Sequence, residues 1–100
     1  ELKFNGLSIN IPARTVSVGG TKVDLTPKEY ALLECLLRNK NTVMSREQLL
    51  VKCWGYDYEG ESRAVDTHIK RLREKLEGVS EKWSVKTVWG VGYKFEVLDR

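Results

Sequence analysis

Positively charged side chains are concentrated in one short segment of this sequence. Residues 63–75 hold five basic and two acidic residues, whereas the chain of 100 residues holds 17 and 14. The rest of the chain therefore carries twelve residues of each sign and no net charge. One basic element on a neutral body is typical of a protein that binds a phosphate backbone. The charged residues of the segment are Arg63, Asp66, Lys70, Arg71, Arg73, Glu74 and Lys75.

The spacing of apolar residues in this segment predicts a helix over residues 63–77. Val65, Ile69, Leu72 and Leu76 recur at i, i+4, i+7 and i+11, which forms one narrow stripe that faces a core. A step of about 100° per residue then directs Thr67 and Glu74 away from that core. Arg63, Lys70 and Arg71 flank them on the outward face, while Arg73 and Asp66 lie on one shoulder of the helix and His68 on the other.

The outward face has the chemistry to read DNA. The major groove admits a helix, and an arginine there can pair bidentately with a guanine edge, so we predict that Arg71 and Thr67 read bases. Cations toward the edges of the face can meet phosphates, which position a helix without reading the sequence. Asp66 is expected to pair with a nearby arginine, because its charge opposes the phosphates. The phosphate contacts predicted on this helix are Arg63, His68, Lys70 and Arg73.

Purely structural interpretations of the same side chains stay open at this point. The charged face could simply be solvated, with internal pairs such as Lys70 and Glu74 one turn apart. His68 could be a hydrogen-bonded packing residue, which is the more common role of a lone histidine on the shoulder of a helix. The surrounding elements favour the DNA-binding interpretation of the face.

Those elements begin with a predicted antiparallel sheet over residues 1–25. Apolar residues there are spaced by two, as in strands that are buried on one face. The pairs Asn5-Gly6 and Gly19-Gly20 tolerate positive φ and are typical of hairpin turns. Pro12 suits the bend between the second and third strands.

Two helices and a hairpin complete the predicted fold. Thr26 with Glu29, and Ser45 with Gln48, have the spacing of capping boxes, so we predict helices over residues 26–39 and 45–54. A tight turn between two alternating runs predicts a β-hairpin over residues 83–98. The fold class is therefore α+β, a single winged helix-turn-helix domain over residues 1–100, in which the hairpin is the wing. The expected core or near-core residues are Tyr30, Leu33, Trp54, Val65, Ile69, Trp83 and Phe95.

Other classes of protein find little support. No apolar run approaches the roughly 18 residues of a membrane span, and no secretion signal opens the chain, so we expect a cytoplasmic protein. Cys35, Cys53 and His68 lack the number and spacing of zinc ligands, so neither a metal nor a cofactor is expected. Gly90-x-Gly92 is too short for a dinucleotide fingerprint, and no nucleophile lies beside a base, so we do not expect an enzyme.

Five short motifs follow one another along nearly the whole chain. They are Leu25-Thr26-x-x-Glu29, Ser45-Arg46-x-x-Leu49-Leu50, Trp54-Gly55, Arg63-x-Val65-Asp66-x-His68-Ile69-x-x-Leu72-Arg73-x-Lys75-Leu76 and Thr87-Val88-x-Gly90-x-Gly92-Tyr93. Each motif is weak by itself, but five in this order and spacing are hard to obtain by chance. In these motifs the sequence resembles the effector domain of OmpR/PhoB-type response regulators.

The resemblance implies partners and a mode of action. Such domains form the C-terminal region of two-component transcription factors, after a phosphorylatable receiver domain that this sequence lacks. Phosphorylation pairs the receivers, and two effector domains then lie head to tail on direct-repeat DNA. The third helix enters the major groove, and the wing reaches the adjacent minor groove. We therefore expect sequence-specific binding to double-stranded DNA in transcription control, by a domain that is a monomer when isolated.

The resemblance also implies contacts outside the third helix. The loop over residues 55–61 touches RNA polymerase in some members, which makes its acidic residues candidates for that contact, although an acidic loop is commonly just a soluble one. On the wing, Thr87 and Lys86 are candidates for contacts to the DNA backbone, with Lys94 beside them, and Tyr93 for a hydrogen bond to a phosphate. The acidic loop residues are Asp57, Glu59 and Glu61.

Trp89 departs from the family pattern. Many members carry an arginine at this position in the wing turn, where it inserts into a narrow minor groove. Tryptophan cannot neutralise a phosphate, but it could pack against sugars or act as a wedge at a base step. We expect instead that Trp89 packs on the domain's own surface or meets a neighbouring protomer.

Two alternative functions stay open. A winged helix can serve protein contacts instead of DNA, because function depends on the site and not on the scaffold. A steep dependence of DNA binding on salt would separate the two. Alternatively, the domain could belong to a DNA-binding regulator that has no receiver.

Overall fold

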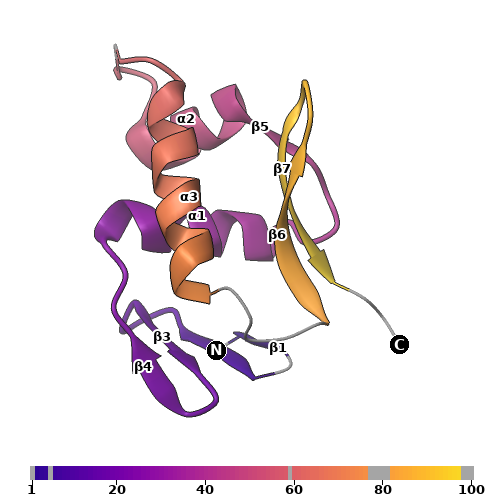
Figure 1. Cartoon of the computed structure of the whole chain (residues 1–100). Coiled ribbons are helices and arrows are strands. Elements are labelled where there is room, and N and C mark those ends of the chain that lie inside the picture. The colour runs from indigo at the N-terminus through magenta and orange to yellow at the C-terminus, as the bar shows by residue number, and fades with distance from the viewer. Residues whose placement is uncertain (1, 5, 59, 77–81, 98–100) are drawn as a thin grey trace.

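The computed structural model describes residues 2–4, 6–58, 60–76 and 82–97 of the chain (Figure 1). Their elements follow the order β1, β2, β3, β4, α1, β5, α2, α3, β6 and β7. An antiparallel sheet, three helices and a C-terminal hairpin confirm the expected α+β winged-helix fold. Residue 77, where the third helix was expected to end, lies outside the described residues.

The N-terminal sheet lies beneath the helices in the view of Figure 1. Its four antiparallel strands pair in the order β1-β2-β3-β4. Gly6 has φ +95° in the turn that leads into β2, a conformation that residues with a Cβ rarely adopt. The face toward the helices is apolar, with Leu7, Ile9 and Val16 buried. The strands are β1 (Leu2–Phe4), β2 (Leu7–Asn10), β3 (Thr15–Val18) and β4 (Thr21–Val23).

The first two helices begin at the predicted capping boxes. Helix α1 (Pro27–Arg38) starts where the Glu29 N–H donates to Thr26 Oγ1 at 3.2 Å and the Thr26 N–H donates back to Glu29 Oε1 at 3.0 Å. Helix α2 (Arg46–Trp54) repeats this exchange between Ser45 and Gln48. Each box satisfies backbone donors that have no partner within the helix. Among the described residues, no helix is long and apolar enough to cross a membrane.

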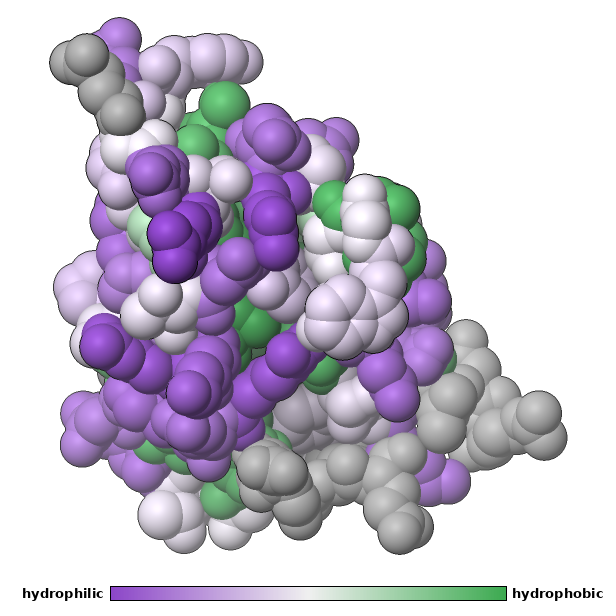
Figure 2. Space-filling view, turned by 45° about the horizontal axis from the view of Figure 1, so that its top comes forward, coloured by the Kyte–Doolittle hydropathy of each residue, from purple (hydrophilic) through white to green (hydrophobic). Residues whose placement is uncertain are grey.

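The third helix and the wing stand side by side. Helix α3 (Arg63–Leu76) runs in front of α1, and the hairpin of β6 (Trp83–Val88) and β7 (Gly92–Val97) rises next to it (Figure 1). The short strand β5 (Met44–Ser45) pairs with β7, so the second sheet has the order β5-β7-β6. Figure 2 shows strongly hydrophilic side chains over the helices beside paler and apolar side chains of the wing.

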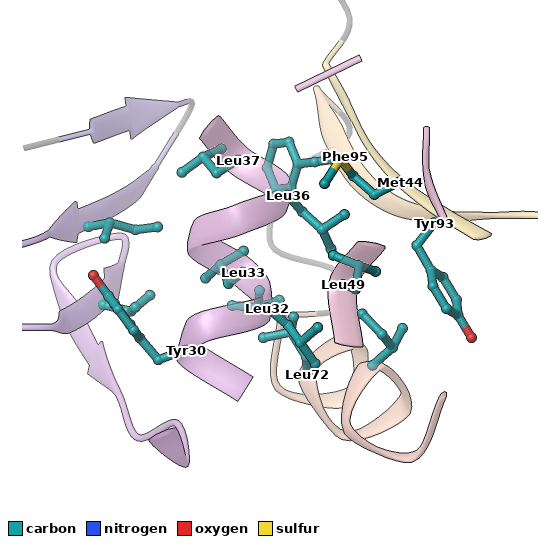
Figure 3. Packing of buried hydrophobic residues seen from close by; sticks show 14 of the residues in the cluster. Tyr30, Leu32, Leu33, Leu36, Leu37, Met44, Leu49, Leu72, Tyr93 and Phe95 are labelled. Atoms are coloured by element: carbon teal, nitrogen blue, oxygen red, sulfur yellow. The ribbon is translucent and has the colours of Figure 1, made fainter. Parts of the chain in front are cut away.

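One apolar cluster joins both sheets to the helices. The leucines of α1 occupy its centre, where Leu33 and Leu36 are fully buried (Figure 3). Val65, Ile69, Leu72 and Leu76 of α3 face this cluster, as their spacing predicted, and Phe95 enters it from β7. Trp54 is only half-buried at its edge. Because α3 is held along its whole apolar stripe, its opposite face is presented to solvent in a fixed direction.

Gly92 allows the strands of the second sheet to approach closely. It pairs with Ser45 of β5 and with Val88 of β6. A Cβ at this position would overlap the carbonyl oxygen of Met44 and lie 2.8 Å from the Ser45 Cα. The glycine is therefore needed for the sheet that anchors the wing, independently of any backbone strain.

An ion pair with a buried carboxylate ties α3 to the start of α1. The Lys75 Nζ donates to Glu29 Oε1 at 2.6 Å and to the Asp24 carbonyl at 2.9 Å, and the Glu29 side chain is 1% exposed. Burial alone would raise the pKa of Glu29. The hydrogen bonds from Lys75 and from the Thr26 N–H, with the charge of Lys75, outweigh that effect and lower the pKa below its ordinary 4.5.

Removal of the Lys75 charge is expected to destabilise the fold. Lys75→Met leaves the Glu29 carboxylate buried with one cation fewer, and breaking a buried pair typically costs roughly 3–5 kcal/mol. Because 35% of the Lys75 side chain is exposed, water can replace part of the interaction. We therefore expect a loss of about 2 kcal/mol at pH 7, measured by urea unfolding.

The double variant Glu29→Gln/Lys75→Met is the control, because glutamine keeps the cap acceptor and removes the buried charge. It should be more stable than Lys75→Met; lower stability would contradict this account. Since the folded pKa of Glu29 is depressed, its contribution to stability is present above pH 4.5 and is lost as the pH falls through the folded pKa. The advantage of the wild type over Glu29→Gln should therefore shrink below pH 4.5.

Candidate nucleic-acid interface

The outward face of α3 carries the residues that were predicted to read bases. Thr67 and Arg71 are exposed, as are Arg63 and Lys70, which flank them. The Thr67 hydroxyl lies 3.4 Å from the Arg63 carbonyl of the preceding turn, a long hydrogen bond that a better acceptor can replace. The Arg63 guanidinium lies 3.7 Å from the Glu61 carboxylate, and both side chains are highly exposed. This face therefore presents one hydroxyl, three cations and the carboxylate of Glu74 to solvent.

Arg73 does not belong to that exposed face. This half-buried residue donates from Nε to the Val85 carbonyl at 3.0 Å and from Nη2 to the Thr87 hydroxyl at 2.5 Å. Its guanidinium also lies 5.4 Å from the centre of the Tyr93 ring. The structure thus brings together three residues that were predicted to contact phosphates, and it uses Arg73 to fasten α3 to β6.

Asp66 forms a second connection between the helices and the wing. Its Oδ1 accepts from Arg46 Nε of α2 at 3.0 Å and from the Tyr93 hydroxyl of β7 at 2.5 Å. The expected pairing of Asp66 with an arginine is therefore present. Burial, followed by the hydrogen bond to Asp66, raises the pKa of Tyr93, so its hydroxyl stays protonated. A hydrogen bond from Tyr93 to a phosphate stays a prediction. It would require the Tyr93 hydroxyl to give up its hydrogen bond to Asp66.

A cleft opens between the wing, the start of α2 and the side of α3 that faces the wing. Its volume is about 490 Å³, and Arg46, Glu47, Asp66, Arg73 and Thr87 line it together with the turn of the wing. A guanidinium has five N–H donors. The hydrogen bonds found among the described residues use one donor of Arg46 and two of Arg73. The remaining donors give the cleft the chemistry to accept an anionic oxygen.

Sequence reasoning missed Arg46 as a member of this site. Arg46 lies in the first turn of α2, directly after the cap residue Ser45, and 20 positions before Asp66. The only signal in the sequence was an arginine beside a cap that opens a helix. Its pairing with Asp66 depends on how α2 and α3 cross, which periodicity does not define.

His68 packs against a neighbouring helix. Its ring lies 5.5 Å from the Trp54 ring at an angle of 59°, and its buried Nδ1 has no partner among the described residues. Lys28 approaches the same tryptophan at 5.0 Å. This arrangement favours the packing role for His68, and its contact with a phosphate stays a prediction.

The two faces of the hairpin carry different candidates. Register pairs Thr87 with Tyr93 and Lys86 with Lys94, and successive residues of a strand point to opposite faces. Thr87 and Tyr93 face α3, whereas the two lysines lie on the outer face. Lys86 is exposed, and the half-buried Lys94 pairs with Glu96 at 3.6 Å. Only the first pair therefore belongs to the cleft.

Trp89 does not pack on the surface of its own domain. Its side chain is 90% exposed, and Val91 next to it is 54% exposed. The expectation of packing on the domain's own surface was wrong, because nine-tenths of Trp89 is left in solvent, while contact with a neighbouring protomer stays a prediction. In the loop after α2, Asp57 and Glu61 are exposed, while Glu59 lies outside the described residues.

The structure also places the residues that were considered as metal ligands. Cys35 and Cys53 are free and half-buried. Within the described part of the chain, no three His, Cys, Asp or Glu side chains gather where they could hold a metal ion.

Comparisons with known proteins agree with this geometry. A family model described as "Transcriptional regulatory protein, C terminal" matches residues 20–95. The transcriptional regulatory protein ResD of Bacillus subtilis (strain 168) is 54% identical over 98 residues, which make up 96% of this chain and 41% of ResD. This chain therefore spans less than half the length of that relative.

Solved structures of similar domains share the fold. The DNA-binding domain of Bacillus subtilis CssR is 37% identical with a TM-score of 0.79, and the match covers 89% of this chain and 98% of that domain. The DNA-binding domain of Klebsiella pneumoniae RstA, solved in complex with the RstA box, is 35% identical with a TM-score of 0.82. That match covers 95% of both chains.

Proposed function

This chain belongs to the family of transcriptional regulatory C-terminal domains of the OmpR/PhoB type, and from that premise we propose that it binds double-stranded DNA sequence-specifically. In this proposal α3 enters the major groove, and the domain controls transcription at its site. ResD is a transcriptional regulatory protein and the RstA domain was solved on its DNA box, which supports the same role here.

One observation carries the proposal: α3 is buried along one stripe and presents Thr67, Arg71 and two more cations on the opposite face. A helix with its side chains is about 10–12 Å across, which matches a major groove about 12 Å wide. Its 14 residues extend over about 21 Å, enough to follow the groove floor past several base pairs. In this position Arg71 and Thr67 meet base edges.

The residues around this face would position the helix on the phosphates. Arg63 and Lys70 flank α3 and meet the two strands. The cleft offers the remaining donors of Arg46 and Arg73 with the Thr87 hydroxyl, and Tyr93 and His68 take part if they exchange their present contacts. Lys86 and Lys94 lie on the outer face of the wing, so they meet DNA only if it curves around the hairpin.

The whole-protein context is also a proposal. A receiver domain would precede this single winged-helix domain and would pair on phosphorylation, so that two copies bind direct repeats head to tail in the cytoplasm. The isolated domain would be a monomer without DNA. Asp57, Glu59 and Glu61 would face RNA polymerase from the loop after α2.

Selection from a randomised duplex pool at moderate salt tests the proposal. We expect enrichment of a short motif, most informatively as two direct copies about 10 base pairs apart. Affinity for the enriched duplex should also fall steeply with salt, because phosphate contacts release counterions. Binding without an enriched motif would mean that α3 binds the phosphate backbone electrostatically and does not read the sequence. No binding at low salt would overturn the proposal in favour of a protein-contact module.

Asp66→Asn separates the positioning role of Asp66 from its charge. Loss of a negative charge near DNA should strengthen binding, but the variant also weakens the hold on Arg46 and Tyr93. We expect affinity for the selected duplex to fall about fivefold, the effect of one hydrogen bond of about 1 kcal/mol. Fluorescence anisotropy with selected and scrambled duplexes measures both affinities.

Glu74→Gln is the matched control, because Glu74 is an exposed acidic residue of the same helix. It removes the same charge without touching the wing, so binding to both duplexes should strengthen. If Asp66→Asn strengthens binding as Glu74→Gln does, Asp66 acts only through its charge.

A further inference from the structure

The tip of the wing exposes a large aromatic side chain to solvent. Trp89 is 90% exposed, whereas Trp83 is buried and Trp54 is half-buried. Tryptophan is usually well covered in a folded protein, and an apolar side chain held in water is a marker of an interaction site. The neighbouring Val91 extends this apolar tip.

The turn holds Trp89 in a defined direction. The Val91 N–H donates to the Val88 carbonyl at 3.0 Å, and Gly90 has φ +80°, the sign that a type II turn requires at its third residue. A Cβ on Gly90 would meet no other atom within 4 Å, so the glycine serves the backbone conformation. The tip is therefore an ordered projection.

The strands below the tip are fastened to the helices. Arg73 bonds β6 through Val85 and Thr87, and Asp66 bonds β7 through Tyr93. Trp89 and Val91 line the 490 Å³ cleft together with Arg46 and Arg73, and the acidic residues Glu47 and Asp66 line it as well. The apolar tip thus shares one cleft with the two arginines that we assign to DNA.

We propose that Trp89 is an aromatic wedge that partly unstacks one base step in the groove next to that read by α3. This inference rests on the proposed DNA binding and adds a deformation of the duplex to it. The turn Val88–Gly92 carries no charged side chain, so it has no ionic attraction for phosphates. An indole can instead stack on a base or separate adjacent bases, as apolar wedges of minor-groove proteins do.

The wedge predicts a sequence preference that needs no hydrogen bond. Pyrimidine–purine steps unstack more easily than other steps, so the selected duplex should carry one at a fixed distance from the motif read by α3. Unstacking is unfavourable by itself, so the wedge depends on the cations of α3 and the cleft to hold the duplex. Trp89 should therefore act only on duplexes that α3 already binds.

Fluorescence tests the wedge on the enriched duplex. The difference in emission between wild type and Trp89→Ala isolates Trp89 from the two more buried tryptophans. We expect the duplex to quench this Trp89 emission. We also expect the fluorescence of 2-aminopurine placed at the step to increase with wild type but not with Trp89→Ala. Trp89→Ala should bind about tenfold more weakly, as expected for one lost stacking contact.

Two further variants show whether stacking or charge is responsible for the contribution of residue 89 to binding. Trp89→Arg should restore affinity with a steeper salt dependence but leave 2-aminopurine dark. Tyr56→Ala truncates another exposed aromatic residue, which is 89% exposed and lies just after α2. It should change neither the response of the Trp89 emission to the duplex nor the 2-aminopurine fluorescence. Brightening with Trp89→Arg would overturn the wedge.

The other outcomes also decide the inference. Tight, motif-specific binding without a change in Trp89 emission or in 2-aminopurine would overturn the wedge and leave the proposed function intact. Trp89 emission that changes with protein concentration in the absence of DNA would show that a second copy covers the tip. If no duplex binds at low salt, both proposals fail.

Discussion

Gly92→Ala is expected to lower the stability of the domain by about 3 kcal/mol, the upper range for forcing a methyl group into a closely packed site. The new Cβ would overlap the Met44 carbonyl oxygen and crowd the Ser45 Cα. Both neighbours are backbone atoms, which cannot rotate away as a side chain can. The methyl group fits only if β5 separates from β7. Because Ser45 is also the cap of α2, this separation would disturb the start of that helix.

Thermal and urea unfolding, followed by circular dichroism, measure this loss. For a domain of this size, 3 kcal/mol corresponds to a fall in Tm of more than about 10 °C. Gly90→Ala is a matched control in the same wing. It has a positive φ and open space around its Cβ, so it should lose only about 1 kcal/mol through backbone strain. Equal losses at the two positions would contradict the steric account.

Arg71→Ala is expected to weaken binding to the selected duplex by about 10- to 100-fold, which is the value of a bidentate contact to a guanine edge. Binding to a scrambled duplex should weaken much less, because the lost contact reads a base. The expectation follows from the position of Arg71, which is exposed on α3 and directed away from the core. Selection with the variant should also relax the motif at one base pair.

Arg63→Ala provides the comparison, since it removes an equally charged and exposed side chain from the start of the same helix. If Arg63 meets a phosphate, both duplexes should lose similar affinity and the salt slope should decrease by about one unit. Anisotropy titrations at three salt concentrations distinguish the two patterns. Equal losses for selected and scrambled duplexes with Arg71→Ala would refute its base-reading role.

Local signals in the sequence predicted most of the fold. The capping boxes at Thr26 and Ser45 set the starts of α1 and α2, and the four-residue stripe of α3 set which face would be buried. These features depend on residues within three or four positions of one another. Helix propensity and apolar periodicity act over the same short range of sequence, so they were sufficient to predict these elements.

The features that were missed depend on contacts between elements. Lys75 was counted with the basic residues of the third helix, but it bonds Glu29, 46 positions earlier. Arg46 pairs with Asp66, which lies 20 positions later in the sequence. Arg73 bonds Thr87 of the wing, 14 positions later. The crossing of α2 with α3 and the placement of β6 determine these pairs. The exposure of Trp89 likewise depends on the direction of its turn.

The tether of the wing through Arg73 has a kinetic consequence. A hairpin that is already bonded to α3 needs no closing step after encounter, so the entropy of ordering it is lost during folding and not during association. Association should then approach the rate set by electrostatic steering and slow with ionic strength, and a later phase that is independent of protein concentration would report deformation of the duplex and not closing of the wing. Discrimination between duplexes would consequently reside in how long each complex lasts.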